Sequence, residues 1–201
     1  MKKDFEILVL LINLFNSIPT VGKKNATKMA LGMLKQGIDN FDIWIDTLTY
    51  LKDNLKWCTL CNNISNQEQC LICLDNSRDR NTLCIVSTWQ DLLTLEEHQV
   101  FNGQYYVLMN EINLQKNITA NDLKLDVLLE RIATKKWKEI IIATNPTING
   151  ELTAQYIYQL LKDKNSLLIT RIAHGLPVGS AINYADQFTL KKSLEGRKKI
   201  A

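Results

Sequence analysis

Four of the five cysteines lie in one short segment as two Cys-x-x-Cys pairs, Cys58 with Cys61 and Cys70 with Cys73. Each pair places two thiolates on one tight turn, and two such pairs complete a tetrahedral shell of four sulfurs around one ion. A closed shell has no open position for a substrate, so the spacing predicts a structural metal site, with Zn²⁺ as the ion. The segment between the pairs is short and polar, so metal binding would supply its folding energy.

Other uses of these cysteines remain open at the level of sequence. Two disulfides, a redox pair or an iron–sulfur cluster would also use two Cys-x-x-Cys pairs. Tight clustering of the cysteines is not the usual layout of a secreted disulfide framework. The fifth, Cys84, lies in an apolar run, and we expect it to be a buried strand residue.

Composition excludes a membrane protein and favours a cytoplasmic one. The chain has 201 residues, of which 46% are hydrophobic and 22% charged, enough to bury a core. No segment approaches the roughly 20 consecutive apolar residues that cross a bilayer. The apolar run at 5–12 follows Asp4 and contains Glu6, and it lacks a cleavage site of small residues, so we do not expect a signal peptide.

The first 55 residues carry apolar side chains at helical spacing. Three helices are predicted, near 8–15, over 23–35 and over 41–55, and the second is expected to bury Ala26, Met29, Ala30 and Met33. Pro19 and Gly22 break the pattern between the first two helices.

After the cysteines the rhythm changes to short apolar runs that alternate with amphipathic stretches. The runs predict strands at 83–86, 105–109, 140–143 and 167–170, and the stretches predict helices near 89–98, 122–136 and 151–163. Continuous apolar strands alternating with helices indicate a largely parallel sheet covered on both faces. After Arg171 we expect a further strand and a short helix before a basic tail. The fold class is therefore α+β in several modules.

The turn Ile18-Pro19-Thr20-Val21-Gly22 opens onto a basic helix start. Backbone N–H groups at a helix N-terminus suit a phosphate, and Gly22 would permit close approach of the ligand. Lys23, Lys24 and Lys28 add positive charge at the same end. Two helices that pack without a ligand are often joined by a similar Pro/Gly turn, and basic chain ends can simply be solvated. DNA binding at this turn is therefore one interpretation, and a ligand-free helical turn is the other.

The segment from Asn145 to Glu151 lies between a predicted strand and a predicted helix, where parallel sheets usually bind ligands. Glu151 could bind Mg²⁺, but an acidic residue in a first helical turn also matches the helix dipole. His98 and His174 lie in no metal or nucleophile motif, and no catalytic motif is found.

Taken in order, these segments resemble the RecR family of bacterial recombination proteins. The resemblance rests on the helix-hairpin-helix-like segment 18–30, the four-cysteine finger, a Toprim-like strand at 103–109, and the segments ATNPTINGELTA (143–154), TRIAHGLPVG (170–179) and LEGRK (194–198). It implies a helix-hairpin-helix module at 1–56, a zinc finger at 57–74, a Toprim domain at 80–174 and a C-terminal segment at 175–201.

The resemblance also implies a function and partners. RecR proteins form ring-like oligomers that can encircle DNA, and they act with RecO, and in many bacteria with RecF, to load RecA on single strands coated by SSB protein. We therefore expect a DNA-binding recombination mediator without catalysis that binds single-stranded DNA and junctions and forms a dimer or a tetrameric ring. Gly22, Lys23, Lys24 and Lys28 match the family's DNA-binding region.

The chain departs from the family at four places. Thr20 stands where relatives have Gly, and Lys23 where they have Pro. Ser87 replaces a Glu at the end of the first Toprim strand, and Gln115-Lys116-Asn117 replaces an acidic segment. One carboxylate at Glu151 cannot build a two-metal site, so Mg²⁺ is not expected. The alternative function is a magnesium-dependent nuclease or a primase-like enzyme of the Toprim type, in which Asn145 and Glu151 would form the site.

Overall fold

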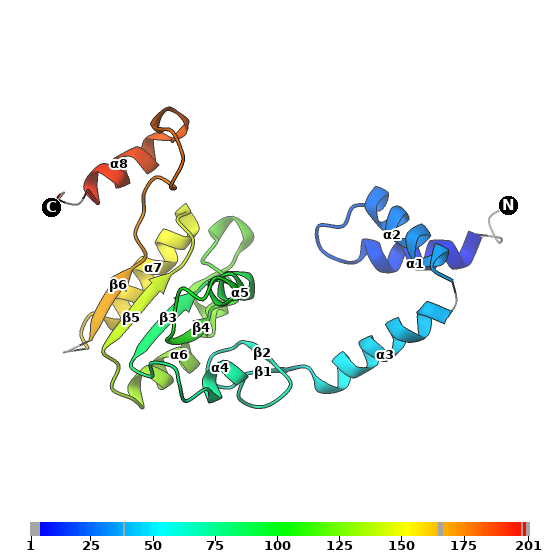
Figure 1. Cartoon of the computed structure of the whole chain (residues 1–201), viewed down its shortest axis with the longest axis horizontal. Helices are drawn as coiled ribbons and strands as arrows, with labels where there is room; N and C mark the ends of the chain where they lie inside the picture. Colours follow the sequence, from blue (N-terminus) through cyan, green and yellow to red (C-terminus); the bar gives the residue numbers. More distant parts are fainter. Residues whose placement is uncertain (1–4, 38, 165–166, 198, 200–201) are drawn as a thin grey trace. The chain divides into compact units, whose positions relative to one another are not determined.

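The computed structural model describes residues 5–37, 39–164, 167–197 and 199. The chain forms two compact units, Met1–Leu55 and Lys56–Ala201 (Figure 1). Each unit is described by itself below. None of the helices in the described ranges is long and apolar enough to cross a membrane.

In the N-terminal unit, helices α1 (Glu6–Asn16) and α2 (Lys23–Lys35) pack against each other. Phe15, Ala26 and Ala30 are buried between them. The alanines stand one turn apart on α2, and their small side chains let the two helices approach closely. Met29 was expected in this core but is 42% exposed, because it lies at the margin of the stripe that the two alanines define.

The third helix of this unit, α3 (Asp39–Asn54), has the predicted apolar stripe, but none of its side chains joins the core described for this unit. Every side chain from 42 to 53 is exposed, including Trp44, Ile45 and Leu48. A helix with this pattern normally buries its apolar face against another element. The stripe is therefore a surface that a neighbour has to cover.

The second unit begins with the cysteine segment. Strands β1 (Lys56–Trp57) and β2 (Ile64–Ser65) form a small antiparallel hairpin, and the short helix α4 (Leu71–Leu74) follows. The sequence analysis did not predict these short elements, because two-residue strands carry no periodicity.

A four-stranded, all-parallel sheet forms the centre of this unit, as the apolar runs predict. Its strands lie side by side in the order β4-β3-β5-β6 (Figure 1). Their bounds are β3 (Thr82–Val86), β4 (Gln104–Val107), β5 (Glu139–Ala143) and β6 (Leu168–Arg171).

Helices cover both faces of the sheet. Helix α5 (Trp89–Glu97) packs on one face over Cys84, Val86 and Tyr105. Helices α6 (Leu125–Ala133) and α7 (Ile148–Leu161) pack on the other, over a larger core that includes Leu83, Ile85 and Ile140. Alternate residues of β3 thus point to opposite faces, and both sets are apolar because both faces are buried. Cys84 is buried in β3, as expected.

The remaining segments are short. Two 3₁₀ turns, η2 (Leu114–Lys116) and η3 (Ala120–Leu123), lie between β4 and α6. After β6 come η4 (Ile182–Tyr184) and helix α8 (Gln187–Glu195), whose N-cap Asp186 accepts hydrogen bonds from the backbone N–H groups of Phe188 and Thr189. The expected short helix is confirmed. The expected strand after Arg171 is wrong for the described part of this segment, where glycine and proline leave an extended loop.

The turn before α2 shows why glycine would be favoured at position 20, where this chain has threonine. The backbone N–H of Val21 donates to the oxygen of Ile18, and Thr20 adopts φ +73°. This is a turn with Pro19 at its second position and a left-handed residue at its third, where glycine is favoured. A β-branched residue with positive φ is strained.

We predict that Thr20→Gly stabilises the N-terminal unit by about 1 kcal/mol, because glycine removes the cost of a Cβ in the left-handed region. Hydrogen–deuterium exchange of peptides from α1 and α2 measures the effect as slower opening. Thr20→Ala keeps the Cβ and should leave exchange nearly unchanged. Equal protection of the glycine and alanine variants would contradict the strained turn.

Candidate functional site

The four predicted metal ligands meet at one point in the structure. The Sγ atoms of Cys58, Cys61, Cys70 and Cys73 all lie within 4.8 Å of one another, and all four side chains are buried. One pair comes from the β1–β2 hairpin and the other from the start of α4, where Cys70 is the N-cap. In the described ranges, no other group of three or more His, Cys, Asp or Glu side chains is placed to share an ion. Four buried sulfurs with this spacing fit a structural metal site.

The cluster is chemically suited to a cation. Hydrogen bonds from the thiols of Cys61, Cys70 and Cys73 lower the pKa of Cys58, so a thiolate forms there readily. A thiolate is the form that binds metal. The isolated Cys84 behaves in the opposite way, since burial raises its pKa to about 12 and keeps it a neutral thiol.

The cysteine module docks on β4, which is an edge strand of the sheet. The backbone N–H of Val107 donates to the oxygen of Cys61 at 2.9 Å, and Asn62 Nδ2 donates to the oxygen of Val107 at 3.1 Å. Trp89 Nε1 donates to the oxygen of Asn62, and its ring stacks on Trp57. The module therefore protects a strand edge that would otherwise be exposed.

Arg131 on α6 joins the cysteine module to the sheet through hydrogen bonds. Its Nη1 donates to the backbone oxygens of Leu60 at 2.9 Å and Tyr105 at 2.7 Å, and its Nη2 donates to Gln104 Oε1 at 2.8 Å. Nη2 also lies 3.9 Å from Cys73 Sγ. The guanidinium is buried and its charge favours thiolate at the adjacent cluster. This role of Arg131 could not be predicted from the sequence, because an arginine on an amphipathic helix is normally expected to face solvent.

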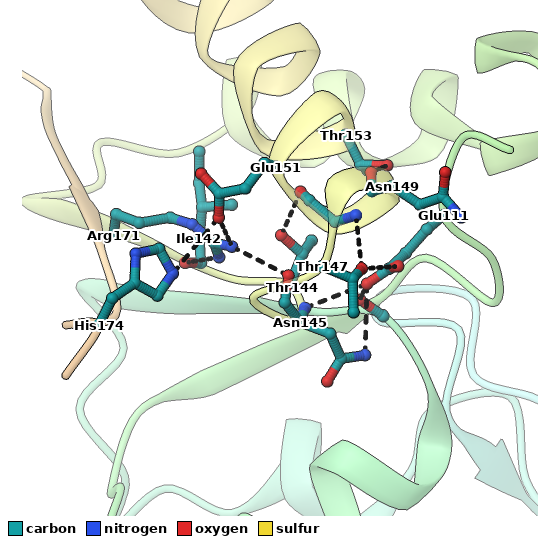
Figure 2. A network of polar contacts seen from close by, with 12 residues as sticks. Glu111, Ile142, Thr144, Asn145, Thr147, Asn149, Glu151, Thr153, Arg171 and His174 are labelled. Atoms are coloured by element: carbon teal, nitrogen blue, oxygen red, sulfur yellow. Dashed lines mark hydrogen bonds and ion pairs between the residues drawn. The ribbon is translucent and has the colours of Figure 1, made fainter. Parts of the chain in front are cut away.

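The second feature is a polar network at the carboxyl edge of the sheet (Figure 2). Its first half is centred on Glu111, in the loop after β4. Glu111 Oε1 accepts from Ser87 Oγ at 2.6 Å and from the backbone N–H of Asn145 at 3.0 Å, while Oε2 accepts from Thr147 Oγ1 at 3.3 Å. Ser87 thus binds a carboxylate that comes from a different loop. The sequence analysis missed Glu111, although its place just after an apolar strand was a usable signal.

The second half is centred on Glu151, in the first turn of α7. Its Oε1 accepts from Arg171 Nη2 at 2.7 Å and lies 3.3 Å from His174 Nε2. Arg171 also donates to the backbone oxygens of Ile142 and Asn145. Figure 2 shows Asn145 between the two halves. Its backbone and side-chain nitrogens face Glu111, and its backbone oxygen faces Arg171.

Helix α7 packs tightly against this loop at Gly150. A Cβ on Gly150 would lie 2.0 Å from the oxygen of Asn145 and 2.9 Å from Glu111 Oε1. Thr147 caps the helix by accepting from the Gly150 N–H, and Thr144 Oγ1 donates to the Gly150 oxygen. Both carboxylates are therefore held by donors of the chain itself in a tightly packed edge.

The predicted DNA-binding residues lie at the start of α2. Gly22 is the N-cap with extended backbone, and no atom lies within 4 Å of where its Cβ would be. Lys23, Lys24 and Lys28 are exposed, and the first turn contains no acidic residue. Positive charge at a helix N-terminus opposes the helix dipole, so this end attracts an anion more strongly than a usual helix start.

Comparison with known families gives two matches. A model of the Toprim domain matches residues 81–173, which contain the whole parallel sheet with α5, α6 and α7. A model described as RecR, C-terminal, matches residues 175–198, which contain α8. The two ranges are consecutive and together cover more than half of the chain. The four cysteines and the N-terminal unit precede both ranges.

We predict that Arg131→Met lowers the free energy of unfolding by about 2 to 4 kcal/mol, because three buried oxygens lose their donor. Urea unfolding followed by circular dichroism measures the loss. Lys136→Met, an exposed substitution a short distance along the chain, is the control and should change stability by less than about 0.5 kcal/mol. Equal stability of the two variants would refute a bridging role of Arg131.

Proposed function

The chain belongs to the RecR family, and we propose that it is a non-catalytic DNA-binding mediator of recombinational repair. The observation that carries this proposal is the order of its parts, a four-cysteine cluster followed by a Toprim match and then a RecR C-terminal match. A Toprim domain occurs in proteins of several activities, whereas the C-terminal match points to RecR and hence to recombination.

The contacts at the carboxyl edge support a role without catalysis. Metal-dependent nuclease or primase chemistry needs carboxylate oxygens free to bind cations. Here Glu151 is paired with Arg171, and Glu111 accepts from Ser87, Asn145 and Thr147. Within the described residues, no group of three carboxylate or histidine side chains lies close enough to share a cation, so we do not propose Mg²⁺ or the enzymatic alternative.

We place the DNA contact at the start of α2. Free backbone N–H groups at a helix N-terminus bind phosphate, and the neighbouring lysines add charge. No ion pair within the described residues involves Lys23, Lys24 or Lys28. The open space beside Gly22 allows a phosphate to approach the backbone. The segment would then act as the helix-hairpin-helix of the family.

We further propose that the protein acts as a homo-oligomer, a dimer or a tetrameric ring. The apolar side chains of α3 support self-association, because a stripe that includes Ile45, Leu48 and Leu51 at 46–60% exposure needs a covering surface. The partners we propose are single-stranded and junction DNA, RecO and, where it exists, RecF, in a cytoplasmic pathway that loads RecA on SSB-coated strands.

The ion that we propose for the four cysteines is Zn²⁺, bound as a structural centre. Cys58→Ser should reduce bound zinc well below one per chain and destabilise the module, since metal binding supplies its folding energy. Inductively coupled plasma mass spectrometry gives the metal content, and thermal unfolding gives the stability. Cys84→Ser is the matched control and should keep full zinc content. Iron in place of zinc, or full zinc in the Cys58 variant, would refute the assignment.

DNA binding is tested by fluorescence anisotropy on a labelled single-strand/duplex junction across a salt series, with and without RecO. Lys23→Glu/Lys24→Glu should weaken binding and flatten the log–log salt dependence by about two units, because each phosphate contact contributes about 0.9. Lys191→Glu/Lys192→Glu, which makes the same charge change on α8, is the control. If the control flattens the slope and the hairpin variant does not, the DNA site lies elsewhere.

A further inference from the structure

A second basic surface lies at the amino edge of the sheet, opposite the polar network. In a parallel sheet the loops that enter the strands meet at this edge. Arg80 stands two residues before β3, Lys135 and Lys136 stand between α6 and β5, and Lys164 follows α7. We name these four residues the amino-edge basic surface.

Two adjacent hollows form this surface. One, of about 360 Å³, is lined by Lys135, Lys136 and Lys164 with Trp137. The other, of about 390 Å³, is lined by Arg80, Lys135 and Trp137, together with the neutral polar side chains of Gln69, Asn76, Gln104 and Thr134. Lys135 and Trp137 line both hollows, so the two are neighbours. No carboxylate lines either hollow within the described residues.

The ring of Trp137 lies under the ammonium group of Lys135. Trp137 is buried, and its Nε1 donates to the backbone oxygen of Arg131 at 3.3 Å. Lys135 Nζ lies 4.3 Å from the centre of the ring and Arg131 Cζ lies 5.5 Å from it. The ring therefore fixes the Lys135 ammonium at the boundary between the hollows, which reduces the ordering cost of binding an anion there.

The charges of this surface lack ionic partners. No ion pair of the described chain involves Arg80, Lys135, Lys136 or Lys164. Burial and the charges of Arg131 and Arg80 lower the pKa of Lys135, and Asp79 offsets only part of this. The Asp79 carboxylate itself accepts from Thr82 Oγ1 and the backbone N–H of Asn81. An added anion would relieve this repulsion.

We propose that the amino-edge basic surface is a second nucleic-acid contact, which binds the phosphate backbone of DNA without reading its sequence. Lysine ammonium groups are point charges that suit phosphate contacts, and such contacts carry no sequence information. Two neighbouring hollows that share Lys135, with further cations in each, fit an extended chain of repeating negative charges. This surface is separate from the α2 site, and its existence does not depend on that site.

An acidic peptide is the competing occupant, but the surface fits it less well. Of the two guanidinium groups nearby, Arg131 donates to backbone and amide oxygens and Arg80 donates one hydrogen bond to Asn76, whereas the other three cations of the surface are lysines. Bidentate recognition of carboxylates uses a free guanidinium, whereas lysines bind phosphates as single charges.

The first test uses the full-length chain with Lys135→Gln/Lys136→Gln on the same labelled junction and salt series. Loss of two phosphate contacts should flatten the log–log slope by about two units, at about 0.9 per contact. Lys116→Gln/Lys124→Gln is the matched control, because it removes equal charge from two exposed lysines near the opposite edge of the sheet. An unchanged slope in the Lys135/Lys136 variant overturns the inference, even where the α2 variant flattens it and the proposed function stands.

The second test locates the contact in the unaltered protein and so does not depend on the folding of a variant. Junction DNA should slow chemical acetylation of Lys135 and Lys136, measured by mass spectrometry, and leave Lys116 and Lys124 unchanged. Equal acetylation of Lys135 and Lys136 with and without saturating DNA overturns the inference. So does polyglutamate binding that depends on Lys135 and Lys136 while DNA binding does not, which would assign the surface to an acidic protein.

Discussion

The buried guanidinium of Arg131 is the interaction on which the second unit depends. It donates to the cysteine module at Leu60, to the edge strand at Tyr105 and to Gln104, and it lies beside Cys73. A buried charge is costly unless hydrogen bonds satisfy it, and here neutral oxygens and sulfur do so. Arg131 also contacts the ring of Trp137, which in turn contacts the ammonium group of Lys135. The metal module, the sheet and the amino-edge basic surface therefore share one support.

The two edges of the sheet carry opposite chemistry. At the carboxyl edge, where parallel sheets usually bind ligands, two carboxylates are held by Ser87, Asn145 and Arg171, and Gly150 permits the close packing that this requires. At the amino edge the cations have no carboxylate in their hollows. Under the proposed function, phosphate contact is therefore expected at the amino edge and not beside the two carboxylates.

The N-terminal unit has a small core and an exposed apolar helix. Its core is small, with Phe15, Ala26 and Ala30 as its buried residues in the described ranges, while α3 exposes every side chain from 42 to 53. Exposed apolar helices are covered in the functional state by another surface. In the proposed oligomer, another copy of the chain would cover this stripe, and several basic helix starts would be available to one DNA. The affinity of such an assembly can exceed that of a single site without any new contact.

Local pattern was sufficient for the features that depend on spacing along the chain. Two Cys-x-x-Cys pairs predicted one shared metal site, and alternation of apolar runs with helices predicted a parallel sheet, because both follow from short-range geometry. The amphipathic pattern of α3 predicted its helix but could not identify its partner. The contacts of Glu111 and Arg131 were decided only by tertiary structure. Their partners lie on other loops and strands, such as Ser87 and Tyr105, and no pattern within one segment records which distant oxygen a charged side chain will reach.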